Sequence, residues 1–300
     1  MTAALLLLLA FVGGVAVQRA WRSDRLRAAT WLAYFWTIAP VLVYVVFRTV
    51  HVDHRLLLAV AAAIAATWLL LGVAYGYAVV TAEERDERGA LALAAACPNT
   101  GFLGYPLAQL VYGAHGLALA VVYDQLSWLV PATSVTTTVA RLHGRRSVDV
   151  DRERPVRAML LNPPLAAMVV ALVLRAAGVD IPGAHALGHV ASKLVGPVGF
   201  FLLGLSLPLE RPAHAPQELR RAAGALVLRF AGGPLALFAF GHALGADIPG
   251  AFYLLSAMPA AFHLLILARV YEMKPALMRL LVLGSTVPAV AAVMLVAGLH

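Results

Sequence analysis

The stretch of sequence that decides the fold is a run rich in proline and glycine, Ala96-Cys97-Pro98-Asn99-Thr100-Gly101-Phe102-Leu103-Gly104-Tyr105-Pro106. It lies inside an apolar segment long enough to cross a membrane as a helix. Proline removes a backbone donor and clashes with the preceding turn, and glycine weakens a helix. The run therefore predicts a membrane helix broken near its middle. Freed backbone groups at that depth are tolerated only against protein or a water-filled cavity, so the break also predicts a site.

Composition explains why the segment belongs in a membrane. Apolar residues make up 62% of the 300 residues and charged residues 13%. Soluble domains have roughly 45–50% and about 25%, respectively. The single cysteine, Cys97, excludes a disulfide framework and a multi-cysteine metal cluster. We expect an integral membrane protein that needs no cofactor and no metal.

Ten apolar stretches satisfy the length of about 20 residues that a spanning helix needs. The sequence therefore predicts an all-α membrane protein of ten transmembrane helices. The first stretch has no basic residue before its leucine run and no small-residue cleavage site after it, which favours a helix over a signal peptide. The ten spans are Thr2–Gln18, Ala28–Phe47, Leu56–Val80, Ala90–Tyr112, Gly116–Ala140, Ala158–Gly178, His189–Leu207, Ala222–Leu244, Gly250–Tyr271 and Ala276–Leu299.

Lysine and arginine set the orientation, because they are enriched in cytoplasmic loops. The five loops on one side, counted with the ends of the spans that flank them, hold 18 of the 23 Lys and Arg residues, and the other side holds three. This predicts a multi-pass protein of the cytoplasmic (inner) membrane with both termini outside. The basic loop Arg141–Arg157 is then cytoplasmic. For that loop we favour contact with anionic lipid over binding of nucleic acid.

The same loop divides the chain into two five-span halves, residues 1–140 and 158–300. An odd number of spans per half means that any repeat between the halves is inverted. The second half has its own interruption in the matching span, Leu255-Ser256-Ala257-Met258-Pro259-Ala260-Ala261-Phe262-His263. Paired interrupted helices at matching positions of inverted halves mark the binding site of secondary transporters.

At these residues the chain resembles the auxin efflux carrier family of membrane transporters. The segment Asn99–Pro106 is close to the family pattern Asn-Thr-Gly-Phe-x-Gly-x-Pro. The size, the ten spans and the central loop also match, so the resemblance covers nearly the whole chain. Further matching segments are Asn162-Pro163-Pro164, Met258-Pro259 and Ala268-Arg269-x-Tyr271.

The resemblance implies a fold like that of bile-acid symporters and sodium–proton antiporters. A panel of spans 1, 2, 6 and 7 would hold a transport domain of spans 3–5 and 8–10, in which spans 4 and 9 cross. It implies elevator-like transport of small organic anions, such as malate, malonate or auxin-like weak acids. The substrate site would comprise Asn99, Thr100, Gly101, Gly104, Pro106, Met258, Pro259 and His263.

The residues themselves explain why anions suit such a site. Half-helix N-termini at a crossing present partial positive charge and free amides. Asn99 and Thr100 add side-chain donors. His263 departs from the family pattern, which often has asparagine there, and it can add charge when protonated. A neutral histidine bonded to a neighbouring helix carbonyl is the alternative.

Asp124 is the one carboxylate of fifteen that falls well inside a span. It lies about eight residues into span 5, roughly 12 Å deep, where an unpaired charge costs on the order of 3 kcal/mol. Arg229 is the deepest cation available to it. An ion pair with Arg229, a proton-coupling role and a displaced span boundary all remain open.

Two rival functions remain to be weighed. The chain has no protease, hydrolase or nucleotide-binding motif, so we do not expect an enzyme. A cation–proton antiporter or sodium-coupled symporter of the same fold is the alternative, although neither span 4 nor span 9 contains a carboxylate. A proton or sodium ion is a possible coupling ion, and small-residue motifs such as Gly72-x-x-x-Gly76 permit a homodimer.

Overall fold

The computed structural model describes residues 3–21, 24–128, 131–145, 162–207 and 216–298. Throughout these ranges the regular structure is helical, apart from an isolated antiparallel bridge between Pro98 and Ala260. Within the same ranges, seven helices are long and apolar enough to cross a membrane. The prediction of an all-helical, multi-pass membrane protein is therefore confirmed. These helices are Ala3–Trp21, Arg25–Thr49, His54–Thr81, Thr100–Trp128, Ala184–Ser206, Pro216–Ala243 and Pro275–Ala292.

One group of helices comes from predicted spans 1, 2, 6 and 7. Helix α1 lies along α10, and α3 packs against both α9 and α10. Helices α2 and α3 are joined by the π-helical turn η1. The bounds are α1 (Ala3–Trp21), α2 (Asp24–Ala33), η1 (Tyr34–Ile38), α3 (Ala39–Thr49), α9 (Pro163–Ala176) and α10 (Ala184–Ser206). Asn162 caps α9, its Oδ1 accepting the Leu165 N–H at 3.2 Å.

Glycines let α1 and α10 approach backbone to backbone. A Cβ atom built on Gly14 would lie 2.2 Å from the Phe201 carbonyl oxygen, and one on Gly204 would lie 2.1 Å from that of Phe11. Real Cβ atoms do not approach a carbonyl oxygen so closely, and closely packed backbone atoms cannot shift without disturbing their neighbours. The α1–α10 contact therefore requires glycine at both positions.

We expect Gly14→Ala to destabilise the protein by about 1–3 kcal/mol, because the added methyl group forces the two backbones apart. Its neighbour Gly13 is the matched control, since a Cβ there meets nothing within 4 Å. Gly13→Ala should leave stability unchanged or raise it slightly through helix propensity. Thermal unfolding of both variants in one detergent measures the difference, and equal melting temperatures would contradict the packing described.

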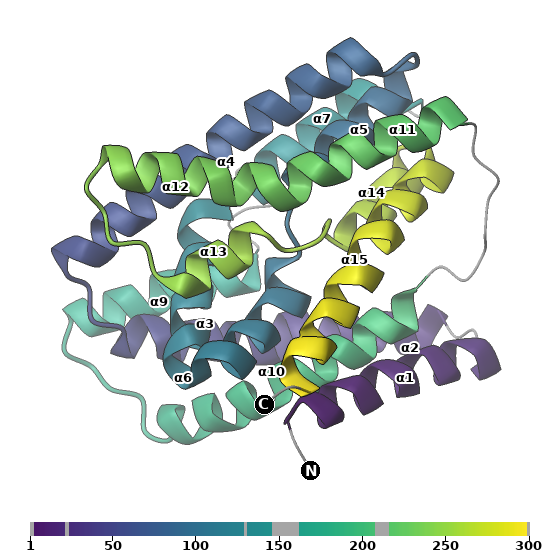
Figure 1. Cartoon of the computed structure of the whole chain (residues 1–300). Helices are drawn as coiled ribbons and strands as arrows, with labels where there is room; N and C mark the ends of the chain where they lie inside the picture. Colours follow the sequence, from purple (N-terminus) through teal and green to yellow (C-terminus); the bar gives the residue numbers. More distant parts are fainter. Residues whose placement is uncertain (1–2, 22–23, 129–130, 146–161, 208–215, 299–300) are drawn as a thin grey trace.

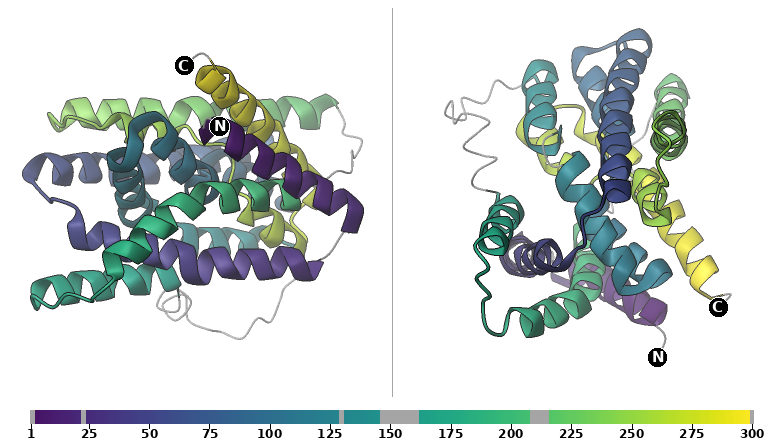
Figure 2. Two further views of the ribbon diagram at one scale, coloured as in Figure 1. Left: turned by 90° about the horizontal axis from the view of Figure 1, so that it is seen from below. Right: turned by 90° about the vertical axis from the view of Figure 1, so that its left-hand side faces the viewer.

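The second group of helices lies on the opposite side of the molecule from the first, except that α15 runs from it towards α1 and α10 (Figure 1). The right-hand view of Figure 2 shows the same arrangement. In this group α4 packs against α5 and α12, and α11 packs against α5 and α15. The π-helical turn η5 joins α11 to α12. The bounds are α4 (His54–Thr81), α5 (Arg85–Ala96), α7 (Thr136–His143), α11 (Pro216–Val227), η5 (Leu228–Gly232), α12 (Gly233–Ala243) and α15 (Pro275–Gly298).

The predicted spans 4 and 5 meet at Gly113. The turn η2 (Thr100–Gly104) runs into α6 (Tyr105–Tyr123), which is interrupted at Gly113 by a φ of 68°. This left-handed conformation suits glycine, because it has no Cβ to clash. The chain continues through two further π-helical turns, η3 (Asp124–Trp128) and η4 (Pro131–Val135), to α7. Span 5 is therefore built from short helical pieces, a feature that its apolar length does not predict.

The acidic run Glu83–Glu87 lies where α4 meets α5 and is only partly exposed to solvent. Asp86 and Glu87 are buried. Glu87 accepts from Arg221 at 2.6 Å and lies 3.4 Å from the Lys274 ammonium, and Asp86 pairs with Arg145 at 2.8 Å. The hydrogen bond from Lys274 also holds the pKa of the Glu84 carboxyl below its ordinary value. Arg221 lies in α11 and Lys274 lies in the turn directly before α15, so the acidic run ties this end of the second helix group together.

The remaining predicted spans differ from the described helices in length. Span 6 appears as the 14-residue α9, and spans 4 and 9 appear as separate half-helices. Most of the basic loop Arg141–Arg157 lies outside the described residues.

Candidate functional site

The two predicted breaks lie side by side and bond to each other. The first, at residues 97–99, separates α5 from η2, and the second separates α13 (Gly250–Ser256) from α14 (His263–Val270). The Asn99 N–H donates to the Pro259 carbonyl at 2.8 Å, and the Ala261 N–H donates to the Cys97 carbonyl at 3.0 Å. These two bonds flank the Pro98–Ala260 bridge. The extended segments thereby satisfy backbone groups that the interruptions free from the helices.

The crossing brings four helix ends together. Helices α5 and α13 end at the crossing, where their chain segments run antiparallel, and η2 and α14 begin there. A helix N-terminus leaves N–H groups unbonded and carries partial positive charge, whereas a C-terminus leaves carbonyls and partial negative charge. The crossing therefore contains two ends of each sign.

Arg229 binds the C-terminal ends of α5 and α13, which carry partial negative charge. Its side chain is 1% exposed and lies in η5. Its Nη1 donates to the carbonyls of Ala95 and Ala96 at the end of α5, and its Nη2 donates to the Ser256 carbonyl at the end of α13. The guanidinium thus bridges both half-helix C-termini and offsets their partial charge.

Asp124 has different partners. One carboxylate oxygen accepts from Thr100 Oγ1, and the other accepts from the Tyr105 hydroxyl at 2.6 Å and from Gln125 Nε2 at 2.9 Å. Within the described residues no ion pair joins Asp124 to Arg229, so the paired arrangement, one of the predicted alternatives, is not formed. Arg229 donates instead to the carbonyls at two helix ends. The sequence does not show that these carbonyls lie close to it.

A cavity of about 160 Å³ lies against the positive helix ends. Asn99, Thr100 and Gly101 line it from the start of η2, and Phe262 and His263 line it from the start of α14. Asn99 Nδ2 and His263 Nε2 are both buried and have no hydrogen-bond partner among the described residues. A buried polar atom without a partner is costly, so the cavity offers two unused polar atoms to a ligand.

The structure divides the predicted site residues into two sets. Asn99, Thr100, Gly101 and His263 line the cavity. The others support the crossing without lining it. The Pro259 carbonyl accepts the Asn99 N–H, and Pro106 lies in the first turn of α6. Gly104 packs closely on Met258, whose side chain would lie 3.4 Å from a Cβ atom added to the glycine. These four residues therefore shape the breaks, and we assign them no ligand contact.

Sequence reasoning missed three polar side chains in the same cavity. They are Tyr34 from η1, Tyr105 from α6 and Gln125 from η3. The Tyr34 hydroxyl donates to the Gly101 carbonyl at 2.8 Å and so ties the first helix group to the break. Gln125 could have been predicted as a site residue, because it directly follows Asp124. Nothing in the sequence distinguishes a tyrosine that lines a site from one that only packs in an apolar span.

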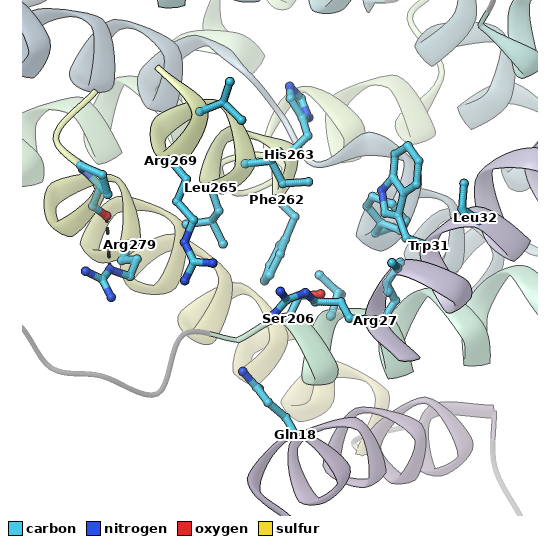
Figure 3. Close-up of a pocket in the computed structure, with 17 residues that line it drawn as sticks. Gln18, Arg27, Trp31, Leu32, Ser206, Phe262, His263, Leu265, Arg269 and Arg279 are labelled. Atoms are coloured by element: carbon cyan, nitrogen blue, oxygen red, sulfur yellow. Dashed lines mark hydrogen bonds between the residues drawn. The ribbon is translucent and has the colours of Figure 1, made fainter. Parts of the chain in front are cut away.

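A larger cavity of about 630 Å³ lies beside the crossing and shares Phe102, Phe262 and His263 with the small one. Figure 3 shows Phe262 pointing into it, together with the side chains of Arg27 and Arg269 from different helices. It lies between α1, α2 and α10 on one side and α14 and α15 on the other.

Comparison with known proteins finds similar sequences among membrane transporters. The chain is 27% identical over 157 residues to an uncharacterized transporter of Methanothermobacter thermautotrophicus, an alignment that covers 52% of this chain and 50% of the relative. The chain thus matches about half the length of that curated relative. A family profile described as membrane transport protein matches residues 37–153 and 149–296. The chain belongs to this membrane transport protein family, the auxin efflux carrier family that its Asn99–Pro106 motif resembles.

Proposed function

We propose that the protein is a secondary transporter that binds a small organic anion, of the carboxylate class, at the crossing of its two interrupted helices. The observation that carries this proposal is the small cavity, where two helix N-termini meet two buried polar atoms that have no partner, Asn99 Nδ2 and His263 Nε2. A carboxylate accepts hydrogen bonds from such groups and is favoured by the positive helix ends.

The arrangement of charge at the crossing supports an anion over a cation at this point. Arg229 already offsets the partial charge of the two helix C-termini. On the cavity side, the one carboxylate among the described lining residues is Asp124, which accepts from Thr100 Oγ1 at the start of η2. With a proton on Asp124, the N-termini keep a partial positive charge that no described carboxylate offsets. The field that remains therefore attracts a negative group without a dedicated lysine.

Alternating access is the second part of the proposal. Under this proposal the first group of helices is the panel and the second group is the transport domain (Figure 1). Both breaks, in matching spans of the two halves, would belong to an inverted repeat of residues 1–140 and 158–300. Elevator-like movement of the second group against the first would carry the bound anion across the inner membrane, with both termini outside.

Asp124 supports a proton as the coupling ion of the proposed transporter. Its carboxylate lines the same cavity as the anion site, and each of its described hydrogen-bond donors is neutral. Two negative groups in one small cavity repel each other, so an anion binds better when Asp124 carries a proton. Binding would thus take up a proton, and transport would be coupled to the proton gradient.

The position of Asp124 also supports the second candidate function, a cation–proton antiporter or sodium-coupled symporter. The carboxylate that spans 4 and 9 lack is supplied by η3, and Asp124 accepts a hydrogen bond from Thr100 of the break. A carboxylate at a crossing is the group that such a cation site needs.

Uptake by proteoliposomes tests both candidates. We expect wild-type protein to accumulate at least one labelled mono- or dicarboxylate, faster with an imposed proton gradient. Asp124→Asn should exchange that carboxylate but not concentrate it. Sodium or proton flux without any carboxylate, lost in Asp124→Asn, would favour the antiporter and contradict the anion proposal.

The pH dependence of affinity tests the role of His263. Imidazole ordinarily changes charge between pH 5 and 8, and its charged form attracts a carboxylate. Affinity should therefore weaken as the pH rises from 5.5 to 8.5 in wild type. His263→Asn should show a shallower slope, because only the proton taken up by Asp124 remains. The measurement is equilibrium binding of one carboxylate, corrected for the ionisation of the ligand. Identical profiles would make His263 a packing residue.

A further inference from the structure

The small and the larger cavity lie next to each other, and three side chains line both. They are Phe102 from η2 and Phe262 and His263 from the start of α14. A side chain that lines two cavities lies between them. Figure 3 shows the ring of Phe262 projecting into the larger cavity, while the His263 side chain points away from that ring. The two phenylalanines, called here the aromatic wall, therefore separate the small cavity from the larger one.

The aromatic wall is held in place by its own contacts. The ring of Phe102 packs on that of Tyr34, with 4.8 Å between the ring centroids. Its carbonyl lies so close to α10 that a Cβ atom built on Gly199 would be 2.9 Å from the oxygen. Phe262 is 8% exposed and belongs to an apolar core. Since neither ring turns aside without losing these contacts, the wall is a fixed boundary of the small cavity.

The volumes on the two sides of the wall differ in what they accommodate. Drug-sized molecules bind in cavities of about 300–1,000 Å³. The larger cavity, about 630 Å³, lies within this range, and the small one, about 160 Å³, lies below it. The Asn99 Nδ2 atom offered to an anion belongs to the small cavity. A carboxylate that reaches it must therefore fit the smaller volume.

The larger cavity extends to the molecular surface. Ala28 and Arg269 belong to its lining and are exposed. Gln18 near the end of α1 and Ser206 at the end of α10 line it as well. In the predicted orientation all four positions belong to the cytoplasmic side. A molecule that enters from this side meets the aromatic wall before it reaches Asn99.

We propose that Phe102 and Phe262 are specificity-determining residues that limit the substrate to carboxylates of a few carbons and exclude acids that carry an aromatic ring. The larger cavity is the approach from the cytoplasmic side, and the aromatic wall is the size filter at its inner end. The size limit concerns the carboxylate of the proposed function and so rests on that function.

Two pairs of acids that differ by a single phenyl ring test the filter: acetate with phenylacetate, and malonate with phenylmalonate. Their affinities are measured by isothermal titration of the purified full-length chain in detergent. Wild type should prefer the member without the ring. Phe262→Ala leaves a space the size of that ring, so it should shift the preference towards the phenyl acid by roughly 10- to 100-fold, the effect of burying one phenyl group.

Ile266→Ala is the matched control. Ile266 is on the same helix, is 55% exposed and lines the larger of the two described cavities but not the small one. Its variant enlarges the approach without opening the wall, so it should keep the wild-type preference. Phe102→Leu is an independent arm from η2 if Phe262→Ala fails to fold, and it should shift the preference in the same direction. An unchanged preference in the folded wall variants, or an equal shift in Ile266→Ala, would overturn the filter.

A thiol placed in the small cavity tests the wall without any substrate. A Cβ atom built on Gly101 meets nothing within 4 Å, so Gly101→Cys fits, and Cys97→Ala removes the single native cysteine. The rate of labelling by N-phenylmaleimide depends on access to the thiol, so adding Phe262→Ala should raise it roughly tenfold. Adding Ile266→Ala should not.

Equal labelling rates with and without Phe262 would overturn the wall, whatever the acids do. A raised rate in a protein that binds none of the four acids would leave the wall in place but refute the size filter together with the proposed carboxylate site. Binding of the acids with unchanged preference and unchanged labelling would refute the filter alone. Failure of the filter is therefore distinguishable from failure of the proposed function.

Discussion

Replacing Asn99 with alanine is expected to reduce carboxylate uptake by roughly 10- to 100-fold without unfolding the protein. A hydrogen bond to a charged group contributes about 1.5–3 kcal/mol, which corresponds to that range. Stability should fall little, because Asn99 Nδ2 has no hydrogen-bond partner among the described residues and its removal breaks no hydrogen bond there. The backbone bond from Asn99 N–H to Pro259 survives the change. Initial rates in proteoliposomes and the melting temperature in detergent give the two readouts.

Asn162 is a matched control for this variant, since it lines the same cavity but uses its side chain to cap α9. Asn162→Ala should cost about 1 kcal/mol of stability and affect uptake less than Asn99→Ala does. Near-normal uptake by a folded Asn99→Ala protein would remove Asn99 from the binding site. A large loss of stability in Asn99→Ala would show instead that the side chain has a structural partner.

Removal of Arg229 should have the largest effect on stability. Arg229→Gln leaves the carbonyls of Ala95, Ala96 and Ser256 without their donor in a buried site. Each buried unsatisfied group costs about 1–3 kcal/mol, and partial relaxation brings the expected total to about 3–5 kcal/mol. Arg220→Gln, on the exposed side of α11, should change stability by less than about 0.5 kcal/mol. Urea or thermal unfolding in detergent gives the comparison.

The double variant Asp124→Asn with Arg229→Gln separates this account from an ion pair. The two side chains share no hydrogen-bond partner, so their effects on stability should add. An ion pair would instead make the double variant recover much of the loss of either single variant. Recovery would therefore contradict the role assigned to Arg229.

Much of the fold could be predicted from the sequence, because hydrophobic length and helix-breaking residues act locally. Pro98 and Pro259 interrupt their helices regardless of how the rest of the chain folds. Once the two interrupted segments lie side by side, their free backbone groups can bond to each other. Asn99 and His263 could be named for the same reason, since they adjoin the breaks.

What could not be predicted depends on which distant groups meet. Arg229 is far in sequence from Ala95 and Ser256, and its choice of helix carbonyls over Asp124 depends on how η5 lies against the crossing. The burial of Glu87 likewise depends on Arg221 and Lys274 arriving from other helices. Local patterns contain no information on such contacts.

The most direct test of the central claim is an experimental structure of the protein with the carboxylate that gives the highest uptake, determined by cryo-electron microscopy. The account predicts density for that anion in the small cavity at the helix crossing, within hydrogen-bond distance of Asn99 Nδ2 and His263 Nε2. Density for the anion at any other place, including the arginine-lined cavity, with the small cavity empty would contradict it.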